Sequence, residues 1–222
     1  MPDHSEFGLG DPSGIFVHHS DGYFYMSATS RTAHEAMLPG TVLMRTNTLA
    51  DWKSWQCWNG VDFSTSFVDP YAEPCPDPET LSQHVCQPIP SLNFTVLSIK
   101  YSTHFRAYIA TGQGIYTFAN GTRAVCFLYK LSTDDALLHW SAPQLIRRKI
   151  NDGIRSENYP SLLDDAAPSR NFEEVGEVAW LYHTVQTRRA NGTVCTVPPF
   201  CRDLYRQRIR FKATGGVNAT VV

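Results

Sequence analysis

The side chains best placed for chemistry are two carboxylates that stand directly before strand-like segments. Asp11 comes before a run of β-branched and aromatic residues, and Glu157 comes before Asn158 and Tyr159. Two carboxyl groups that face one another can supply an acid and a base to the same reaction. Each residue also has a structural alternative. Asp11 would cap its strand by bonding the backbone, and Glu157 would be an exposed loop residue paired with Arg155, which for Glu157 is the interpretation that the sequence favours.

The sequence contains no motif for several other common kinds of reactive site. There is no His-Glu-x-x-His, no Cys-x-x-Cys pair and no acidic loop with calcium-site spacing, so neither a metal nor another cofactor is expected. A Gly-x-Ser-x-Gly elbow and a phosphate-binding loop are also missing, which argues against lipase-type and nucleotide-hydrolysing reactions. His183 is isolated in the sequence, and we interpret it as a packed structural residue.

Charge and hydropathy argue against two classes of partner. The 222 residues carry a net charge of −2, so the chain lacks the excess of positive charge that is typical of proteins that bind nucleic acid. Basic clusters at 147–149, 188–189 and 206–210 are scattered among acids and strand residues, and we interpret them as solvated strand edges and loops. No segment approaches the ~18 apolar residues of a membrane span.

Glycosylation sequons indicate a secretory route. The chain has four Asn-x-Thr sequons, at Asn93, Asn120, Asn191 and Asn218. Chance would give about one at typical Ser and Thr usage. The first residues are polar and acidic and lack the features of a signal peptide. We therefore expect a secreted glycoprotein whose true N-terminus lies upstream of this sequence.

The cysteines fit the same oxidising compartment. There are six, an even number. Six cysteines allow 15 pairings, and we prefer a scheme with two short loops and one long-range bridge. In that scheme Cys75 pairs with Cys86, Cys195 pairs with Cys201, and Cys57 is left with Cys126. The alternative is that some of them are free buried thiols.

The elements that would position these residues form a repeat, with one unit per ~50 residues. Each unit has an apolar strand, then a strand rich in Tyr and Phe, and ends near a short motif of the type Asp/Thr-Leu-x-x-Trp or Asp-Leu-Tyr. The approximate units are 11–60, 91–148 and 158–211, with long loops at 64–90 and 164–176. No segment shows a sustained helical period.

A unit of four short antiparallel strands cannot bury both faces of its sheet, so it must stack on copies of itself. Radial stacking gives a β-propeller, and we predict an all-β fold of four-stranded blades. Asp21-Gly22, Asn120-Gly121 and Asn191-Gly192 predict hairpin turns within it. Closed propellers have about 4 to 8 blades. Three units therefore predict one partial propeller over residues 1–222, which lacks N-terminal blades or associates with itself.

The blade openings and blade ends carry recognisable motifs. Gly10-Asp11-Pro12-Ser13 followed by Asp21-Gly22-Tyr23-Phe24-Tyr25 forms an opening, and Thr46-x-Thr48-Leu49-x-x-Trp52 and Ser132-x-Asp134 … Trp140 form ends. These motifs resemble those of secreted five-bladed β-propeller glycoside hydrolases of the arabinanase and β-xylosidase type. At a blade end the Asp or Ser caps a turn and the Trp packs between sheets, so the motifs support the fold more than the activity.

The resemblance implies a hydrolase of polysaccharides that inverts the sugar configuration with two carboxyl groups about 6.5–9.5 Å apart. In that family the base is an Asp at the start of an innermost strand, and the acid is a Glu from another blade. Asp11 is then the candidate base, and Glu157 is the candidate acid if burial raises its pKa. Asn158 and Tyr159 are candidates for substrate binding beside it.

Three further residues are candidates for substrate contact. Trp55 could stack on a sugar ring, although packing between blades is the more common role. Arg170 and Glu173 lie in the loop at 164–176 and either reach the substrate or fasten the loop. Two alternatives to a hydrolase remain open. One is a propeller that only binds a polysaccharide or oligosaccharide, and the other is a protein-interaction propeller without a sugar site.

Overall fold

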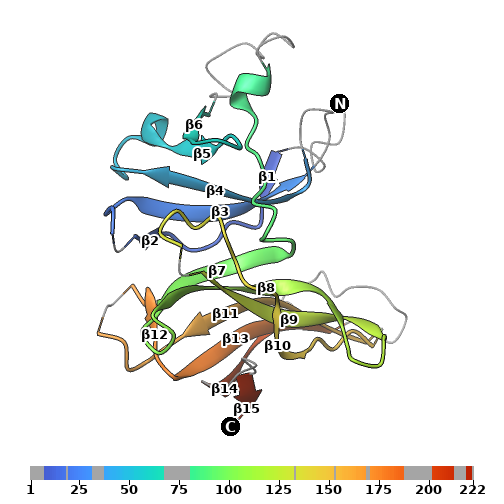
Figure 1. Ribbon diagram of the computed structural model, residues 1–222. Coiled ribbons are helices and arrows are strands. Elements are labelled where there is room, and N and C mark those ends of the chain that lie inside the picture. The colour runs from blue at the N-terminus through green and yellow to red at the C-terminus, as the bar shows by residue number, and fades with distance from the viewer. Residues whose placement is uncertain are drawn as a thin grey trace. The chain divides into compact units, whose positions relative to one another are not determined.

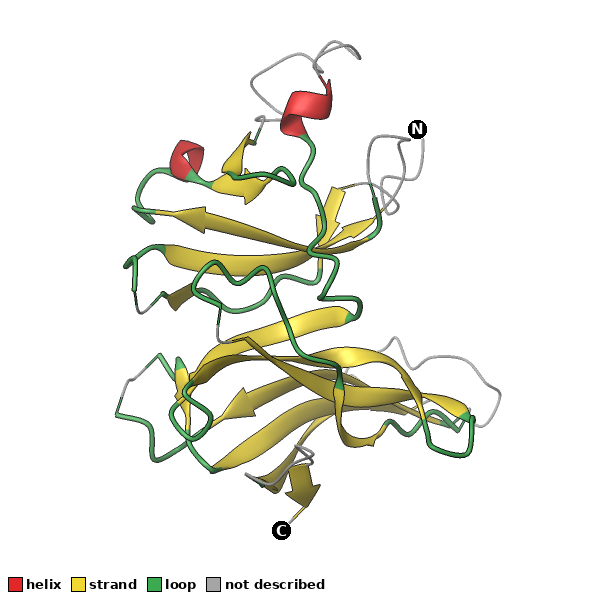
Figure 2. Cartoon of the chain, in the orientation of Figure 1, coloured by secondary structure: helices red, strands yellow, loops and turns green. Residues whose placement is uncertain are grey.

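The computed structural model describes residues 8–18, 20–31, 38–67, 81–132, 134–152, 154–168, 171–187, 202–212 and 219–221. The chain forms two compact units, Met1–Val96 and Leu97–Val222. Strands dominate both units, as Figures 1 and 2 show. The helical pieces within the described residues are two 3₁₀ turns, η2 (Trp52–Ser54) and η3 (Leu81–His84). No helix in this part of the chain is long and apolar enough to cross a membrane.

The first unit contains one antiparallel sheet. Its strands are β1 (Gly8–Gly10), β2 (Phe16–Val17), β3 (Phe24–Arg31), β4 (Gly40–Thr46), β5 (Gln56–Trp58) and β6 (Phe63–Ser66). They follow the order β1-β3-β4-β5-β6, with β2 also paired to β3. Small and apolar side chains from β3, β4 and β5 form a buried cluster, which contains Ala28, Val42, Met44, Cys57 and Cys86.

The second unit contains two sheets. The strands of the second sheet are β7 (Thr95–Ser102), β8 (Ala107–Thr117), β9 (Arg123–Ser132), β10 (Gln144–Arg148) and β12 (Glu174–Val175). Their order is β10-β9-β8-β7-β12, with β12 parallel to β7. The strands of the third sheet are β11 (Arg155–Leu163), β13 (Val178–Thr187), β14 (Arg202–Phe211) and β15 (Ala219–Val221), in the order β11-β13-β14-β15.

The second and third sheets pack on a shared hydrophobic core. Its buried residues are Ile109, Phe127, Tyr129, Ile146, Leu162, Val175, Ala179, Leu181, Ile209 and Phe211. Along β13 buried and half-buried residues alternate, the period of two expected for a strand with one covered face. Each fully buried large apolar side chain contributes about 1.5–3 kcal/mol. The predicted all-β class is confirmed. Antiparallel sheets that stack face to face are the blades of a β-propeller.

Two of the three predicted hairpin turns are confirmed. Asp21-Gly22 joins β2 to β3, and Gly22 has a φ of +70°, which glycine adopts without strain. Asp21 Oδ1 accepts a hydrogen bond of 2.9 Å from the backbone N–H of Tyr23. Asn120-Gly121 joins β8 to β9, with a φ of +80° at the glycine. The third turn, Asn191-Gly192, lies outside the described residues.

The blade-end motif of the second sheet is a capped turn. Asp134 accepts hydrogen bonds from the backbone N–H groups of Ala136, Leu138 and His139 at 3.1, 2.9 and 3.1 Å. Trp140 is buried, and its indole N–H donates to the carbonyl of Leu137 at 2.7 Å. The capping role predicted for Asp134 is confirmed. Trp52, at the blade end of the first unit, is instead 48% exposed.

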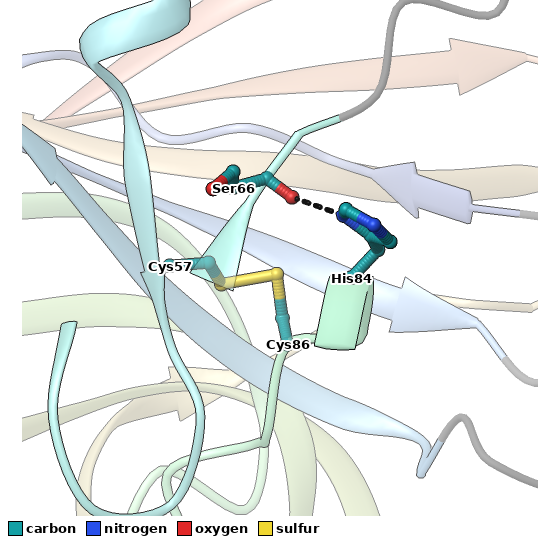
Figure 3. The surroundings of a disulfide bond; sticks show 4 residues. All are labelled: Cys57, Ser66, His84 and Cys86. Carbon is teal, nitrogen blue, oxygen red and sulfur yellow. Dashed lines mark hydrogen bonds between the residues drawn. A yellow bond between two sulfur atoms is a disulfide. The ribbon is translucent and has the colours of Figure 1, made fainter. Parts of the chain in front are cut away.

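The disulfide of the first unit differs from the predicted pairing. Cys57 on β5 is joined to Cys86, just after η3, with 5.5 Å between their Cα atoms (Figure 3). Cys126 is a free, buried thiol. The pairings of Cys86 with Cys75 and of Cys57 with Cys126 are therefore wrong. Cys57 and Cys86 meet because β4 brings them into one apolar cluster, a contact that loop length does not reveal. Cys75, Cys195 and Cys201 lie outside the described residues.

Breaking the Cys57–Cys86 bond should lower the free energy of unfolding. The bond closes a loop with a sequence separation of 29, for which the loss of chain entropy predicts about 3 to 4 kcal/mol. Denaturant unfolding of a Cys57→Ser/Cys86→Ser variant measures the effect, and Cys126→Ala is the control that keeps the bond. Mass spectrometry of non-reduced peptides should find Cys57 joined to Cys86. A peptide that joins Cys75 to Cys86 would contradict the structure.

Candidate functional site

Glu157 is a buried carboxylate where the second and third sheets meet. It lies on β11 opposite Val185 of β13, on the covered face of the third sheet, and is only 4% exposed. Its Oε1 accepts a hydrogen bond of 2.6 Å from Nη2 of Arg147, which belongs to β10. Its Oε2 accepts one of 2.7 Å from the backbone N–H of Ile150. The carboxylate therefore links the edge strands of two sheets.

The environment of Glu157 favours its charged form. Burial raises the pKa of this carboxyl group, but the hydrogen bonds from Arg147 and from the backbone of Ile150 outweigh it, and the pKa is lowered overall. The raised pKa that Glu157 would need as a general acid is therefore not found, because Arg147 and the backbone N–H of Ile150 stabilise the charged carboxylate. The interpretation of Glu157 as an exposed partner of Arg155 is also wrong, since Arg155 pairs with Asp152.

Arg147 holds a histidine as well as the carboxylate. Its Nη2 lies 3.1 Å from Nε2 of His183, and the His183 nitrogen lies 3.3 Å from Glu157 Oε1. Burial, together with the charge of Arg147, lowers the pKa of His183 although Glu157 opposes this. Arg147 has only N–H donors, so Nε2 of a neutral His183 accepts this hydrogen bond. Phe127 lies under the Arg147 guanidinium, 5.2 Å from ring centre to Cζ.

A second set of polar groups lies at the rim of this cluster and is half-exposed. Lys149 Nζ donates to Asn158 Oδ1 at 2.8 Å and to Gln113 Oε1 at 3.5 Å. Burial lowers the pKa of Lys149, while the charge of Glu157 opposes that shift. An ammonium group and an amide at one rim offer both donors and acceptors to a polar ligand.

Tyr159 stands beside this rim in a conformation that tyrosine rarely adopts. Its φ is +58°, at a bulge where the pairing of β11 with β13 shifts between Asn158 and Ser161. A bulky residue with positive φ is an outlier that costs on the order of 1–3 kcal/mol. The side chain is 45% exposed, so burial does not offset this cost. The guanidinium of Arg202 lies 5.4 Å from the centre of the Tyr159 ring.

Asp11 belongs to the first unit, whereas Glu157 belongs to the second. It follows β1 with a φ of +47°, and its Oδ2 accepts a hydrogen bond of 2.8 Å from Nη2 of Arg31 on β3. Arg31 lies close over β1, since a Cβ at Gly10 would come within 3.1 Å of its Nε. This ion pair fastens β1 to β3, and the catalytic pairing of Asp11 with Glu157 stays a prediction.

Two of the other predicted contact residues have contacts with other elements. Trp55 follows η2 in the first unit and packs against the cluster around the disulfide, which fits its packing alternative. The backbone carbonyl of Glu173 accepts a hydrogen bond of 2.9 Å from the backbone of Tyr101 on β7, which fastens its loop. Burial lowers the pKa of Lys100, and the charge of Glu173 opposes this shift. Arg170 lies outside the described residues.

Three residues of the cluster were missed by sequence reasoning. The sequence predicts solvated charges at Arg147 and Lys149 and an isolated structural residue at His183. Alternation along β13 places His183 on the same face as Leu181 and Val185, which was the available signal. No sequence pattern indicates that Arg147 of the second sheet reaches it. Within the described residues, no group of three His, Cys, Asp or Glu could hold a metal ion.

Comparisons with known proteins give solved structures alone. No family model and no curated protein matches the chain. A GH62 hydrolase in complex with xylotriose matches with a TM-score of 0.47 and 12% identity, over 100% of this chain and 53% of that one. The α-L-arabinofuranosidase PaAbf62A from Podospora anserina in complex with cellotriose matches with a TM-score of 0.44 and 12% identity, over 100% and 53%. Sucrose-6-phosphate hydrolase from Lactobacillus gasseri matches with a TM-score of 0.42 and 10% identity, over 96% and 33%. The chain thus spans about half the length of the first two proteins.

The lowered pKa of Glu157 predicts a stability that depends on pH. Its folded-state pKa lies below the unfolded value of about 4.3. The stabilisation is therefore present above that value and is lost as the pH falls through the folded-state pKa. At neutral pH, Glu157→Gln should lower the free energy of unfolding by about 3 kcal/mol, because it leaves Arg147 uncompensated. The difference from the parent protein should shrink below about pH 4.

Urea unfolding at neutral and acidic pH measures this difference. Glu177→Gln is the matched control, because the Glu177 side chain is 54% exposed and its pair with Arg210 is long, at 3.7 Å. That variant should unfold within about 0.5 kcal/mol of the parent protein. A cost of Glu157→Gln that stays constant from neutral to acidic pH would mean that its charge does not stabilise the fold.

Proposed function

We propose that this chain is part of a carbohydrate-active β-propeller and that it binds a saccharide beside β11. The observation that carries the proposal is Tyr159, an exposed aromatic residue with a φ of +58°. Backbone strain that packing does not require is found at functional sites more often than elsewhere. Bulges are likewise used to re-aim a side chain next to a binding site.

The neighbours of Tyr159 suit a ligand rich in hydroxyl groups. The ring offers an apolar face, and the adjacent residue Asn158 accepts a hydrogen bond of 2.8 Å from Lys149. Saccharides present apolar ring faces together with hydroxyl groups that donate and accept. An aromatic face with polar groups at its edge matches both features. The motifs at the blade openings resemble carbohydrate-active propellers, which supports the same class of ligand.

Glu157 supports this site through β11. Both of its oxygens already accept hydrogen bonds from Arg147 and the backbone of Ile150. Its carboxylate fixes the strand that carries Asn158 and Tyr159. Glu157 is therefore a positioning residue in the binding proposal.

A glycoside hydrolase is the second candidate function. The lowered pKa of Glu157 favours it, because an ionised carboxylate can act as a base toward water. Glu157 would then be the base rather than the acid, and a protonated carboxyl group would have to face it. Asp11 is the partner that the resemblance implies. Release of reducing sugar from a polysaccharide, abolished by Glu157→Gln, would favour this candidate over binding alone.

Secretion is the remaining part of the proposal. Asn93 and Asn120 are exposed, and the disulfide between Cys57 and Cys86 suits an oxidising compartment. Asn120 lies in the β8–β9 turn, where Thr122 donates to its side-chain oxygen at 2.7 Å. Both asparagines are therefore open to modification on the surface. Asn191 and Asn218 lie outside the described residues.

Removal of Tyr159 should weaken saccharide binding. Tyr159→Ala deletes the aromatic face and should raise the dissociation constant about tenfold, the equivalent of about 1.4 kcal/mol. Titration calorimetry with xylotriose and cellotriose measures the effect, since these sugars occupy two proteins of similar structure. Trp52→Ala is the control, because Trp52 is as exposed as Tyr159 and lies in the other unit. Equal binding by Tyr159→Ala and the parent protein would contradict the proposal.

Expression through the secretory route of a eukaryotic cell should add N-glycans at Asn93 and Asn120. Treatment with an N-glycosidase should then lower the mass of the protein and convert both asparagines to aspartates. Asn93→Gln and Asn120→Gln should each remove one glycan. Asn59→Gln is the control, because Asn59 is an exposed loop asparagine outside any sequon. Secreted protein with an unmodified Asn93 and Asn120 would contradict the glycoprotein proposal.

A further inference from the structure

The uncovered face of the third sheet carries a row of arginines. Alternate residues of β14 point to opposite faces, and Ile209 and Phe211 belong to the buried core. The residues between them and before them face away from that core. They are all exposed, and they are Arg202, Leu204, Arg206, Arg208 and Arg210. We call the four basic members of this row the arginine face.

Two aromatic rings contact arginines of the arginine face. The guanidinium of Arg206 lies 4.5 Å from the centre of the Trp180 ring, and Arg202 lies over Tyr159. In the register of the sheet, Arg208 is opposite Trp180 and Arg206 is opposite Tyr182. Cation–π contacts hold a guanidinium in a fixed place and leave its N–H groups free to bind. Arg202 and Arg206 are therefore each held against an aromatic ring of the sheet.

The charge of this face is only partly compensated. Arg210 Nε lies 3.7 Å from Glu177, an exposed and long pair. Asp165 accepts a hydrogen bond of 3.1 Å from the Trp180 indole. Among the residues that the structure describes, no carboxylate forms an ion pair with Arg202, Arg206 or Arg208. Like charges side by side on one strand repel one another, and an anionic ligand would relieve that repulsion.

We propose that the arginine face binds an acidic polysaccharide, one whose sugar units carry carboxylates, along β14. This inference rests on the proposed carbohydrate function and names its ligand class. The guanidinium fork matches the planar carboxylate in a bidentate pair, and the face holds arginine without lysine. Successive arginines on one face of a strand stand about 6.8 Å apart. An extended polymer with regularly placed carboxylates can engage several of them at once.

The aromatic side chains of this face argue against nucleic acid as the natural partner. One side of the Trp180 ring and one side of the Tyr159 ring are occupied by arginine, which leaves little aromatic surface for stacked bases. A carboxylated sugar chain needs only the guanidinium groups and the open rim at Tyr159.

Binding of polygalacturonate by the whole protein tests the proposal. At low salt the parent protein should bind it, and an Arg206→Gln/Arg208→Gln variant should bind about tenfold more weakly or worse. Arg123→Gln/Arg148→Gln is the matched control, since both arginines are exposed in the second sheet. That control should bind within about twofold of the parent protein. Raising the salt concentration should weaken binding of the parent protein more than binding of the arginine-face variant. Unchanged thermal unfolding of both variants excludes misfolding as the cause.

Three results would overturn the inference, and they are distinguishable from failure of the proposed function. If xylotriose binds through Tyr159 while polygalacturonate does not bind, the inference fails and the proposed function stands. If neither sugar binds, both fail. If an oligonucleotide or polyglutamate binds as tightly as polygalacturonate and depends on Arg206 and Arg208 in the same way, the face attracts any polyanion and is not a carbohydrate site.

Discussion

The second unit depends on one guanidinium group at the meeting of two sheets. Arg147 bonds Glu157 and His183 and stacks on Phe127, so one side chain holds groups from β9, β10, β11 and β13. A buried ion pair adds little net stability over apolar packing, but removing one partner leaves a charge without compensation. The contact therefore fixes which edge of the third sheet meets the second. The apolar core supplies the larger part of the stability.

The two faces of the third sheet follow from that constraint. The buried residues of β11, β13 and β14 that point toward the second sheet are apolar except for Glu157 and His183, which belong to the cluster around Arg147. The opposite residues are left for solvent and ligands. The bulge of β11 turns Tyr159 outward next to Glu157, and the alternation of β14 turns its arginines to the uncovered face. The residues proposed to bind ligand thus alternate with core residues along the same strands.

Much of the fold could be predicted from local sequence, because strands and turns are local. The Asp21-Gly22 and Asn120-Gly121 hairpins and the Asp134 cap depend on residues within a few positions of one another. The disulfide was missed because Cys57 and Cys86 meet through β4, which loop length ignores. The sequence singles out Glu157 as a candidate, but its charge state is not predictable from the sequence. Its pKa is set by Arg147 of another sheet, and strand periodicity tells which face a residue takes without naming its partner.

The central claim is that saccharide binds at the edge of the third sheet beside Tyr159. Hydrogen exchange measured by mass spectrometry, with and without saturating oligosaccharide, tests it most directly, because it reports on each backbone segment of the unmodified protein. We expect slower exchange in peptides that cover β11 and β14, and no change in peptides from the first unit. Protection confined to the first unit, or no protection at all under saturating ligand, would contradict it.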